Sequence, residues 1–113
     1  MTVAYNKSFV TATIASGATT SDAISMLDSA MTGVISPAAL TGTAFTFTAC
    51  NAVDGTYVPV YDTEGNPVSI TVTTSRAYGL SGSEADALAP WPFVKIVSGS
   101  AEGGDRSIVV CTK

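Results

Sequence analysis

The chain contains no histidine, and only two of its 113 residues are cysteines. Without histidine it cannot build a Ser-His-Asp triad, a Cys-His dyad or most zinc sites. Cys50 and Cys111 lie in distant segments, and neither has a second cysteine at CxxC spacing. No Gly-rich loop ends in Gly-Lys-Ser/Thr, and no GxGxxG motif is present. We therefore predict that the protein is not an enzyme, with no catalytic residues, no cofactor and no metal site.

Basic residues are also scarce, and long apolar runs are missing. Direct binding of nucleic acid, or of an anionic membrane surface, requires clustered positive charge. The five basic residues are scattered along the chain: Lys7, Arg76, Lys95, Arg106 and Lys113. The segment Met1–Lys7 lacks the apolar core of a signal peptide, and no run approaches the length of a membrane span. We expect no nucleic-acid partner, no membrane association and no secretion through a cleaved leader.

Charged residues make up only 12% of the chain, whereas hydrophobic residues make up 46%. Soluble domains usually carry about 25% charged residues. The surface must instead be covered by Thr, Ser, Gly and Ala, which are weakly hydrated and readily buried against other subunits. This composition favours an assembly protein, although Thr-rich faces also occur on monomeric sandwiches. The length is enough for one domain, which we assign to residues 1–113 with residues 1–7 as an N-terminal arm.

Alternating apolar and polar residues predict a chain that is nearly all β. In residues 44–50, for example, Phe45, Phe47 and Ala49 alternate with threonines. Ser83 and Asp86 have the spacing of a capping box for a helix of one or two turns. Residues 23–28 are compatible with a short helix or an extended segment. The sequence predicts a single antiparallel β-sandwich or jelly roll of about seven or eight short strands with at most one short helix. Strands are expected in residues 8–14, 31–35, 44–50, 77–80, 93–97 and 107–112, with two more in 56–74.

The segment 56–74 is predicted to form a hairpin closed by an acidic turn. Gly65 lies in this turn, and Val68, Ile70 and Val72 alternate on one face of the second strand. Asp54, Asp62 and Glu64 could in principle hold a calcium ion or form a glycosidase pair. The spacing of a twelve-residue calcium loop and its terminal bidentate Glu are missing, so we interpret these carboxylates as turn residues.

A proline and several aromatic residues mark the expected interface with other subunits. Pro59 cannot donate a hydrogen bond to a neighbouring strand, so its strand is expected at the edge of a sheet. Tyr57 and Tyr61 flank it on one face, and we predict that they form a subunit or capsid interface with Pro59, Tyr78 and Trp91. Trp91 lies between two prolines and could also stack on a sugar, but packing against the core or a neighbouring subunit is favoured.

Two further expectations concern pairing between side chains. Arg76 and Arg106 are expected to pair with nearby carboxylates such as Asp105 or Asp62. The two cysteines are expected to be buried, free thiols in separate strands.

The order of several segments resembles a group of small virion proteins of tailed bacteriophages. The resemblance covers most of the chain, and 81–92 departs from it. It implies a β-sandwich located in the virion, assembled in the host cytoplasm, that acts as a capsid decoration (cement) protein. The implied partners are the major capsid protein and copies of the chain itself, as a dimer or trimer. A head-fibre or tail module that binds host-surface glycans is the alternative, and no catalytic residues are implied. The segments that carry the resemblance are 13–17, 21–24, 35–40, 45–47, 60–62 with Gly65, 70–72 with 75–76, 94–99 and 105–108.

Overall fold

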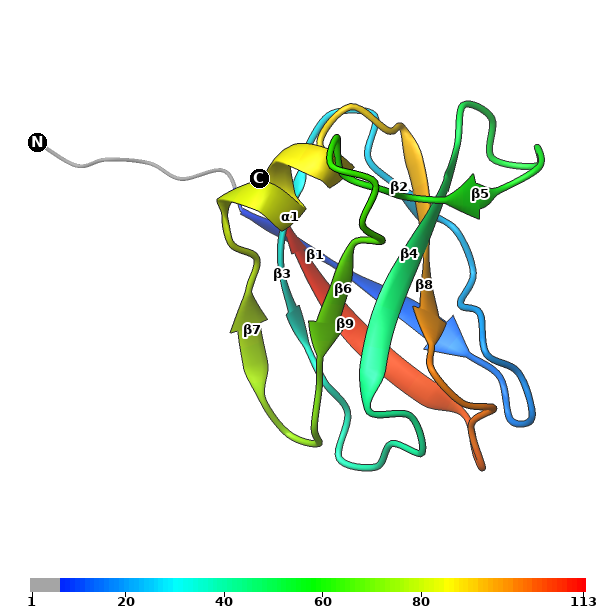
Figure 1. The fold of residues 1–113 in the computed structure, drawn as a ribbon. Helices are drawn as coiled ribbons and strands as arrows, with labels where there is room; N and C mark the ends of the chain where they lie inside the picture. Colours follow the sequence, from blue (N-terminus) through cyan, green and yellow to red (C-terminus); the bar gives the residue numbers. More distant parts are fainter. Residues whose placement is uncertain (1–6) are drawn as a thin grey trace, which may run out of the picture.

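The computed structural model describes residues 7–113, so residues 1–6 of the predicted N-terminal arm lie outside the described residues. Within this part of the chain there are nine strands and one short helix, which confirms the predicted all-β fold (Figure 1). The elements are β1 (Ser8–Ile14), β2 (Ile24–Ser25), β3 (Met31–Ile35), β4 (Ala44–Cys50), β5 (Val58–Pro59), β6 (Ser69–Thr71), β7 (Ala77–Gly79), α1 (Gly82–Leu88), β8 (Phe93–Ser98) and β9 (Arg106–Thr112).

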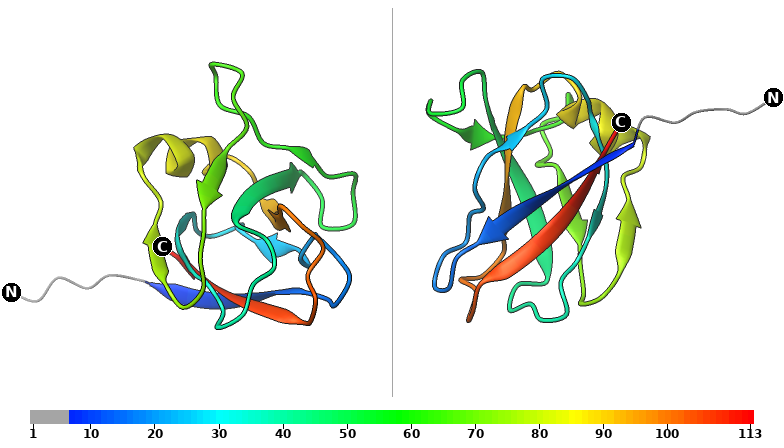
Figure 2. Two further views of the ribbon diagram at one scale, coloured as in Figure 1. Left: turned by 60° about the horizontal axis from the view of Figure 1, so that its bottom comes forward. Right: turned by 180° about the vertical axis from the view of Figure 1, so that it is seen from behind.

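The strands form two antiparallel sheets that face one another. The first sheet has the order β1-β9-β3-β7, and the second has the order β2-β8-β4-β5 with β6 also paired to β4. Figure 2 shows the two layers from other directions, with α1 closing one end of the sandwich. The chain passes from one sheet to the other at most of its connections, so neighbours within a sheet come from distant parts of the sequence.

The core lies between the two sheets and follows the predicted alternation. Phe45, Phe47 and Ala49 of β4 are buried, and they face buried residues of the first sheet such as Ile108 and Val110. On its outer side β4 presents Ala44, Thr46 and Thr48. Burial of alternate residues along β4, β8 and β9 is what a period-two pattern produces in a sandwich.

The predicted hairpin in 56–74 differs from the structure in one respect. Tyr61 and Pro67 form a bridge that closes the turn, as expected, but β5 and β6 do not lie side by side. Instead β5 pairs with the Thr48–Ala49 end of β4, and β6 pairs with its Ala44–Thr46 end. The two strands therefore share one edge of β4 end to end, and the turn between them projects from the sheet. The pairing inside the hairpin is confined to the residues beside the turn, because β4 competes as a partner for both strands.

Two local predictions are also corrected or settled. The helix begins after Ser81, not Ser83, and no side-chain capping bond is formed at its N-terminus. Ser81 and Ser83 both donate to the carboxylate of Glu84, which holds the pKa of Glu84 below its usual value. Residues 23–28, which allowed two interpretations, contain the extended β2 paired with β8.

Candidate functional site

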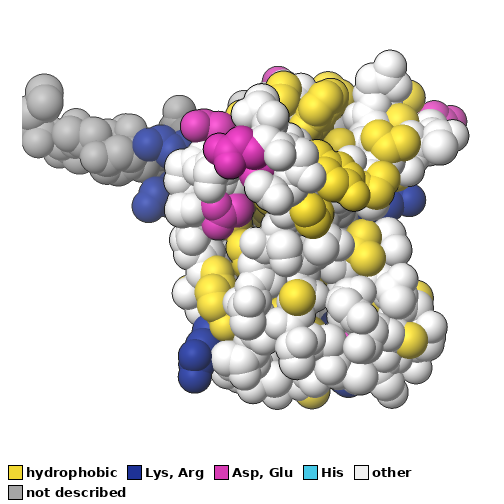
Figure 3. All heavy atoms as spheres, viewed as in Figure 1, with side chains coloured by type: hydrophobic (Ala, Val, Ile, Leu, Met, Phe, Trp, Pro, Cys, Tyr) yellow, Lys and Arg dark blue, Asp and Glu magenta, His cyan; other side chains and the backbone are white. Residues whose placement is uncertain are grey.

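The outstanding surface feature is an apolar cleft at the end of the sandwich where β4 finishes. Its volume is about 400 Å³, and β4, β5 and the segment after α1 all contribute to it. Figure 3 shows hydrophobic side chains gathered at this end of the molecule, whereas the opposite end is mostly uncharged and polar. The lining residues are Ala49, Cys50, Asn51, Thr56, Val58, Pro59, Val60, Tyr61 and Trp91.

Trp91 is held by two hydrogen bonds although the residue is 41% exposed. Its indole Nε1–H donates to the carbonyl of Ala87 at 2.8 Å, and its backbone N–H donates to Leu88 at 3.3 Å. Both acceptors belong to α1, whose last carbonyls need partners from outside the helix. The prolines at 90 and 92 further restrict the chain. The ring is therefore presented to solvent in one orientation at little entropic cost.

Tyr61 forms another wall of the cleft and is 56% exposed. It precedes the acidic turn, in which the Oδ1 atom of Asp62 accepts bonds from the backbone N–H groups of Glu64 and Asn66, both at 2.9 Å. The interpretation of Asp62 as a turn residue is thus confirmed. Because Asp62 orders the turn, the backbone that carries the neighbouring Tyr61 ring is fixed by local hydrogen bonding.

A second hollow of about 390 Å³ is bordered by the same two rings. Tyr61 and Trp91 line both hollows, and the second adds three carboxylates, from Asp62, Glu64 and Asp86. In Figure 3 acidic side chains lie beside the hydrophobic patch at this end. Together the two hollows form a strip with exposed aromatic rings in the middle and hydrogen-bond acceptors on one side. We call the combined lining of the two hollows the aromatic strip. Its central residues are Tyr61 and Trp91, with Val58 and Pro59 on one side and the carboxylates of Asp62, Glu64 and Asp86 on the other.

Of the five predicted interface residues, Pro59, Tyr61 and Trp91 are brought together in the aromatic strip. Tyr57 lies next to it but is half-buried, and its hydroxyl donates to the carbonyl of Val53 at 2.8 Å. The Nζ atom of Lys95 lies 4.3 Å from the centre of its ring. Burial, and then the nearby Cys50 and Asp54, raise the pKa of Tyr57. Tyr57 therefore supports the loop that borders the strip.

Tyr78 does not join the other aromatic residues. It lies on β7 in the first sheet and is half-buried against the core. Its hydroxyl accepts a bond from the backbone N–H of Thr73 at 2.8 Å. Tyr78 follows Arg76 in the sequence, but neither the alternation nor its neighbours indicated that this ring packs inward.

Sequence reasoning missed the most buried charged group, Glu102, which is only 1% exposed. Its Oε1 atom accepts bonds from the backbone N–H of Thr41 at 2.8 Å and from the Nε of Arg106 at 2.9 Å. Its Oε2 atom accepts from the backbone N–H of Gly42 at 2.9 Å and from the hydroxyl of Ser98 at 2.6 Å. Burial by itself would raise the pKa of Glu102, but these donors lower it to about 2. We call this group the Glu102 cluster.

Gly42 is required in the Glu102 cluster because there is no room for a side chain. A Cβ atom at this position would collide with the hydroxyl of Ser98 and lie 3.3 Å from the Oε2 atom of Glu102. In the sequence, Glu102 stands in a stretch of serines and glycines that has the composition of any solvated loop. Only its spacing from Arg106 could have been noticed, and that spacing has no meaning outside a helix.

The expected pairing of the two arginines is corrected in part. Arg106 forms an ion pair with Glu102, not with Asp105, whose Oδ1 instead accepts from the backbone N–H of Ser16. Among residues 7–113 no ion pair involves Arg76, whose backbone is bonded to the side chain of Ser36. The cysteines are free as predicted, and Cys50 is buried as expected, whereas Cys111 is only half-buried.

The described residues contain no group of three or more His, Cys, Asp or Glu side chains placed to hold a metal ion. No helix in the same part of the chain is long and apolar enough to cross a membrane.

The fold and the surface define the protein as a two-sheet antiparallel β-sandwich with an exposed aromatic strip at one end. The crystal structure of the SPBc2 prophage-derived protein YomS is similar to it, with a TM-score of 0.54. The two chains are 13% identical, and the alignment covers 99% of this chain and 98% of that one. At this identity the likeness shows the fold alone. No family model and no curated protein sequence matches the chain.

Proposed function

We propose that this protein is a non-enzymatic structural protein of a phage particle that binds the outer surface of the assembled shell and stabilises it. The aromatic strip carries the proposal, because Val58, Tyr61 and Trp91 expose apolar area at one end of a molecule with few charges. Rigid aromatic residues beside a polar rim are typical of the centre of a protein interface. The prophage origin of YomS, which shares the fold, supports a setting in a phage.

The physical basis of shell stabilisation would be linkage. A protein that binds only the assembled lattice lowers the free energy of that state and opposes disassembly. Many copies bound around symmetry axes add to one another once each is anchored, so a small interface is enough. The major capsid protein would be the partner at the aromatic strip.

The experiment is co-sedimentation of the purified protein with expanded, undecorated shells, followed by thermal melting of the shells. We expect saturable binding and a higher melting temperature of the shell. Trp91→Ala and Tyr61→Ala should each weaken binding by about 1–3 kcal/mol. Ile35→Ala is the matched control, because Ile35 is as exposed as Trp91 but lies on the other sheet. Shells whose stability is unchanged at saturating protein, with no binding, would exclude the role.

A second function is favoured by the carboxylates beside the two rings. Sugars are often bound by an aromatic face together with hydrogen-bond acceptors, and Tyr61 and Trp91 border Asp62, Glu64 and Asp86. Under this alternative the protein would be a head-fibre or tail module that binds a host-surface glycan. A glycan array would show reproducible hits that Trp91→Ala and Asp86→Asn both abolish, while particle assembly remains normal. An empty array together with shell binding favours the first function.

A further inference from the structure

β1 forms an open edge of the first sheet, and its outward backbone groups are only partly used. In successive residues of β1, the backbone N–H and C=O groups alternate between bonding to β9 and pointing away from it. Thr13 is in the outward phase, since its N–H donates to the Oδ1 of Asp22 at 2.9 Å and its carbonyl accepts from the N–H of Asp22 at 3.2 Å. Phe9 and Thr11 are in the same phase, so their N–H and C=O groups face the open edge.

This edge lacks the devices that usually prevent strands from pairing with other chains. Segment Ser8–Ile14 contains no proline, no glycine and no charged residue, and its pairing with β9 runs without a bulge. Phe9 is 62% exposed. Edge strands of monomeric proteins are normally protected by charge, proline, bulges or covering segments. Among residues 7–113, Asp22 covers only the Thr13 end of this edge, and Phe9–Thr11 are left open.

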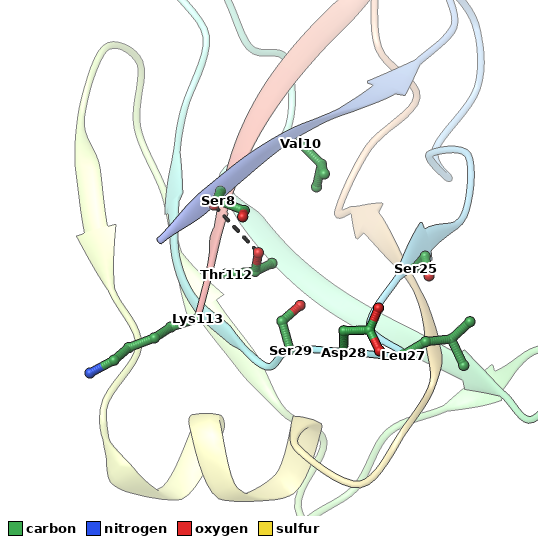
Figure 4. A pocket seen from close by; sticks show the side chains of 8 residues that line it. All are labelled: Ser8, Val10, Ser25, Leu27, Asp28, Ser29, Thr112 and Lys113. Atoms are coloured by element: carbon green, nitrogen blue, oxygen red, sulfur yellow. Dashed lines mark hydrogen bonds between the residues drawn. The ribbon is translucent and has the colours of Figure 1, made fainter. Parts of the chain in front are cut away.

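A hollow lies directly behind the open edge, between β1 and the segment after β2. It has a volume of about 550 Å³, and Figure 4 shows Val10 projecting from β1 toward it, with Leu27 on the segment across from it. Leu27 is 66% exposed. The charged residues at its rim, Asp28 and Lys113, have opposite signs. A strand added to β1 would therefore satisfy the backbone groups and also cover apolar side chains.

We propose that this edge pairs with β1 of a second copy, antiparallel and about a two-fold axis at Val10. In this register Phe9 of each copy lies opposite Thr11 of the other, so the outward groups of both residues bond across the interface. Val10 meets Val10 of the second copy on the side of the hollow, where the two Leu27 side chains can join it. The pairing is isologous, as in most closed dimers.

The charges flanking the strand favour a second copy over an unrelated strand. In the register centred on Val10 the two strands pair over residues 8–12, and residue 7 of one copy follows at the point where Asp22 of the other covers the outward groups of Thr13. Lys7 is thereby brought next to Asp22, which bonds to Thr13. The two-fold axis repeats this contact of opposite charges at both ends, while the uncharged strand between them brings no like charges together. The dimer uses none of the aromatic strip, so it is independent of the function proposed above.

The test measures the oligomeric state of the full chain by sedimentation equilibrium, with Thr11→Pro as the disrupting variant. The N–H of Thr11 points to the open edge, so proline there removes a bond across the dimer and none to β9. We expect a wild-type dimer whose dissociation constant rises roughly ten- to hundredfold in Thr11→Pro. Trp91→Ala is the control and should dimerise as the wild type does. A monomeric wild type, or a dimer that Trp91→Ala dissociates and Thr11→Pro does not, would overturn the proposal.

Cross-linking tests the register and does not depend on whether Thr11→Pro folds. In a background of Cys50→Ala and Cys111→Ser, Val10→Cys should form a disulfide between copies on mild oxidation, because residues 10 face one another across the axis. Thr11→Cys should not, since it lies opposite Phe9. Cross-linking of both variants to the same extent, or of Thr11→Cys alone, would contradict the register.

Discussion

The two ends of β4 are built in opposite ways. Near Ala44, the Glu102 cluster draws the loops at 41–42 and 98–106 together through a buried carboxylate with four donors. Near Cys50, the chain leaves Trp91, Tyr61 and Val58 exposed around two hollows. At the Ala44 end the polar groups form hydrogen bonds within the protein. At the Cys50 end aromatic side chains remain exposed and available to a partner. Substitutions at the first end should therefore change folding, and substitutions at the second end should change binding.

Glu102→Gln should have the largest effect on folding. It removes the negative charge and leaves Arg106, whose side chain is 17% exposed, without its ion-pair partner. Breaking a partly buried pair in this way should lower the free energy of unfolding by about 3 kcal/mol. Urea denaturation of the variant measures the loss. Glu64→Gln, in the exposed acidic turn, is the control and should unfold at nearly the wild-type urea concentration. A decrease in the free energy of unfolding below about 1 kcal/mol would mean that the Glu102 cluster contributes no more to stability than an ordinary surface site.

Acid should destabilise the protein through the same residue. The pKa of Glu102 is about 2 in the folded state and about 4.5 in an unfolded chain, so the unfolded state binds its proton more readily. The stabilisation is therefore complete above about pH 4.5 and is lost as the pH falls toward 2, and it amounts to roughly 3 kcal/mol. Denaturation curves between pH 6 and pH 2 measure it. In Glu102→Gln this part of the pH dependence should vanish, and its persistence would assign it to other carboxylates.

A pair of glycine substitutions compares the two ends with the same change. Gly42→Ala places a methyl group against Ser98 and the Oε2 of Glu102 and should cost about 2 kcal/mol by overpacking. Gly82→Ala is at the other end, in α1, where no atom lies within 4 Å of the added Cβ. It should be neutral or slightly stabilising, because alanine favours a helix. Thermal melting of both variants tests the comparison, and equal losses would contradict it.

Thr48→Val should produce the smallest change, in the direction of stability. The Oγ1 atom of Thr48 is buried without a hydrogen-bond partner among the described residues. Replacing the hydroxyl by a methyl group removes an unsatisfied polar atom and should stabilise the fold by up to about 1 kcal/mol. Thr46→Val, two residues earlier on the same face of β4, is the control with an expected change near zero. A clear destabilisation by Thr48→Val would show that the hydroxyl has a partner in solution.

The sequence predicted most of the fold because alternation in a strand depends on neighbouring residues only. The bounds of β1, β3 and β4 agree with the predicted segments, and the acidic turn at Asp62 forms as expected. The grouping of Tyr61 with Trp91 was also anticipated, although they are thirty positions apart. Tyr78 was assigned to the same group and lies in the other sheet, because the order of strands within a sheet does not follow from the alternation of each strand.

What the sequence by itself determined is the class of each segment: extended strands with one apolar face, a turn rich in Asp and Gly, and a surface with few charges. Only the tertiary structure decided which groups meet. Glu102 becomes a buried anchor because two loops distant in the sequence deliver four donors to one carboxylate. β5 and β6 pair with opposite ends of one edge of β4 and not with each other. Which groups pair depends on competition between partners that are distant in the sequence, and the alternation of residues within one segment does not predict the outcome of that competition.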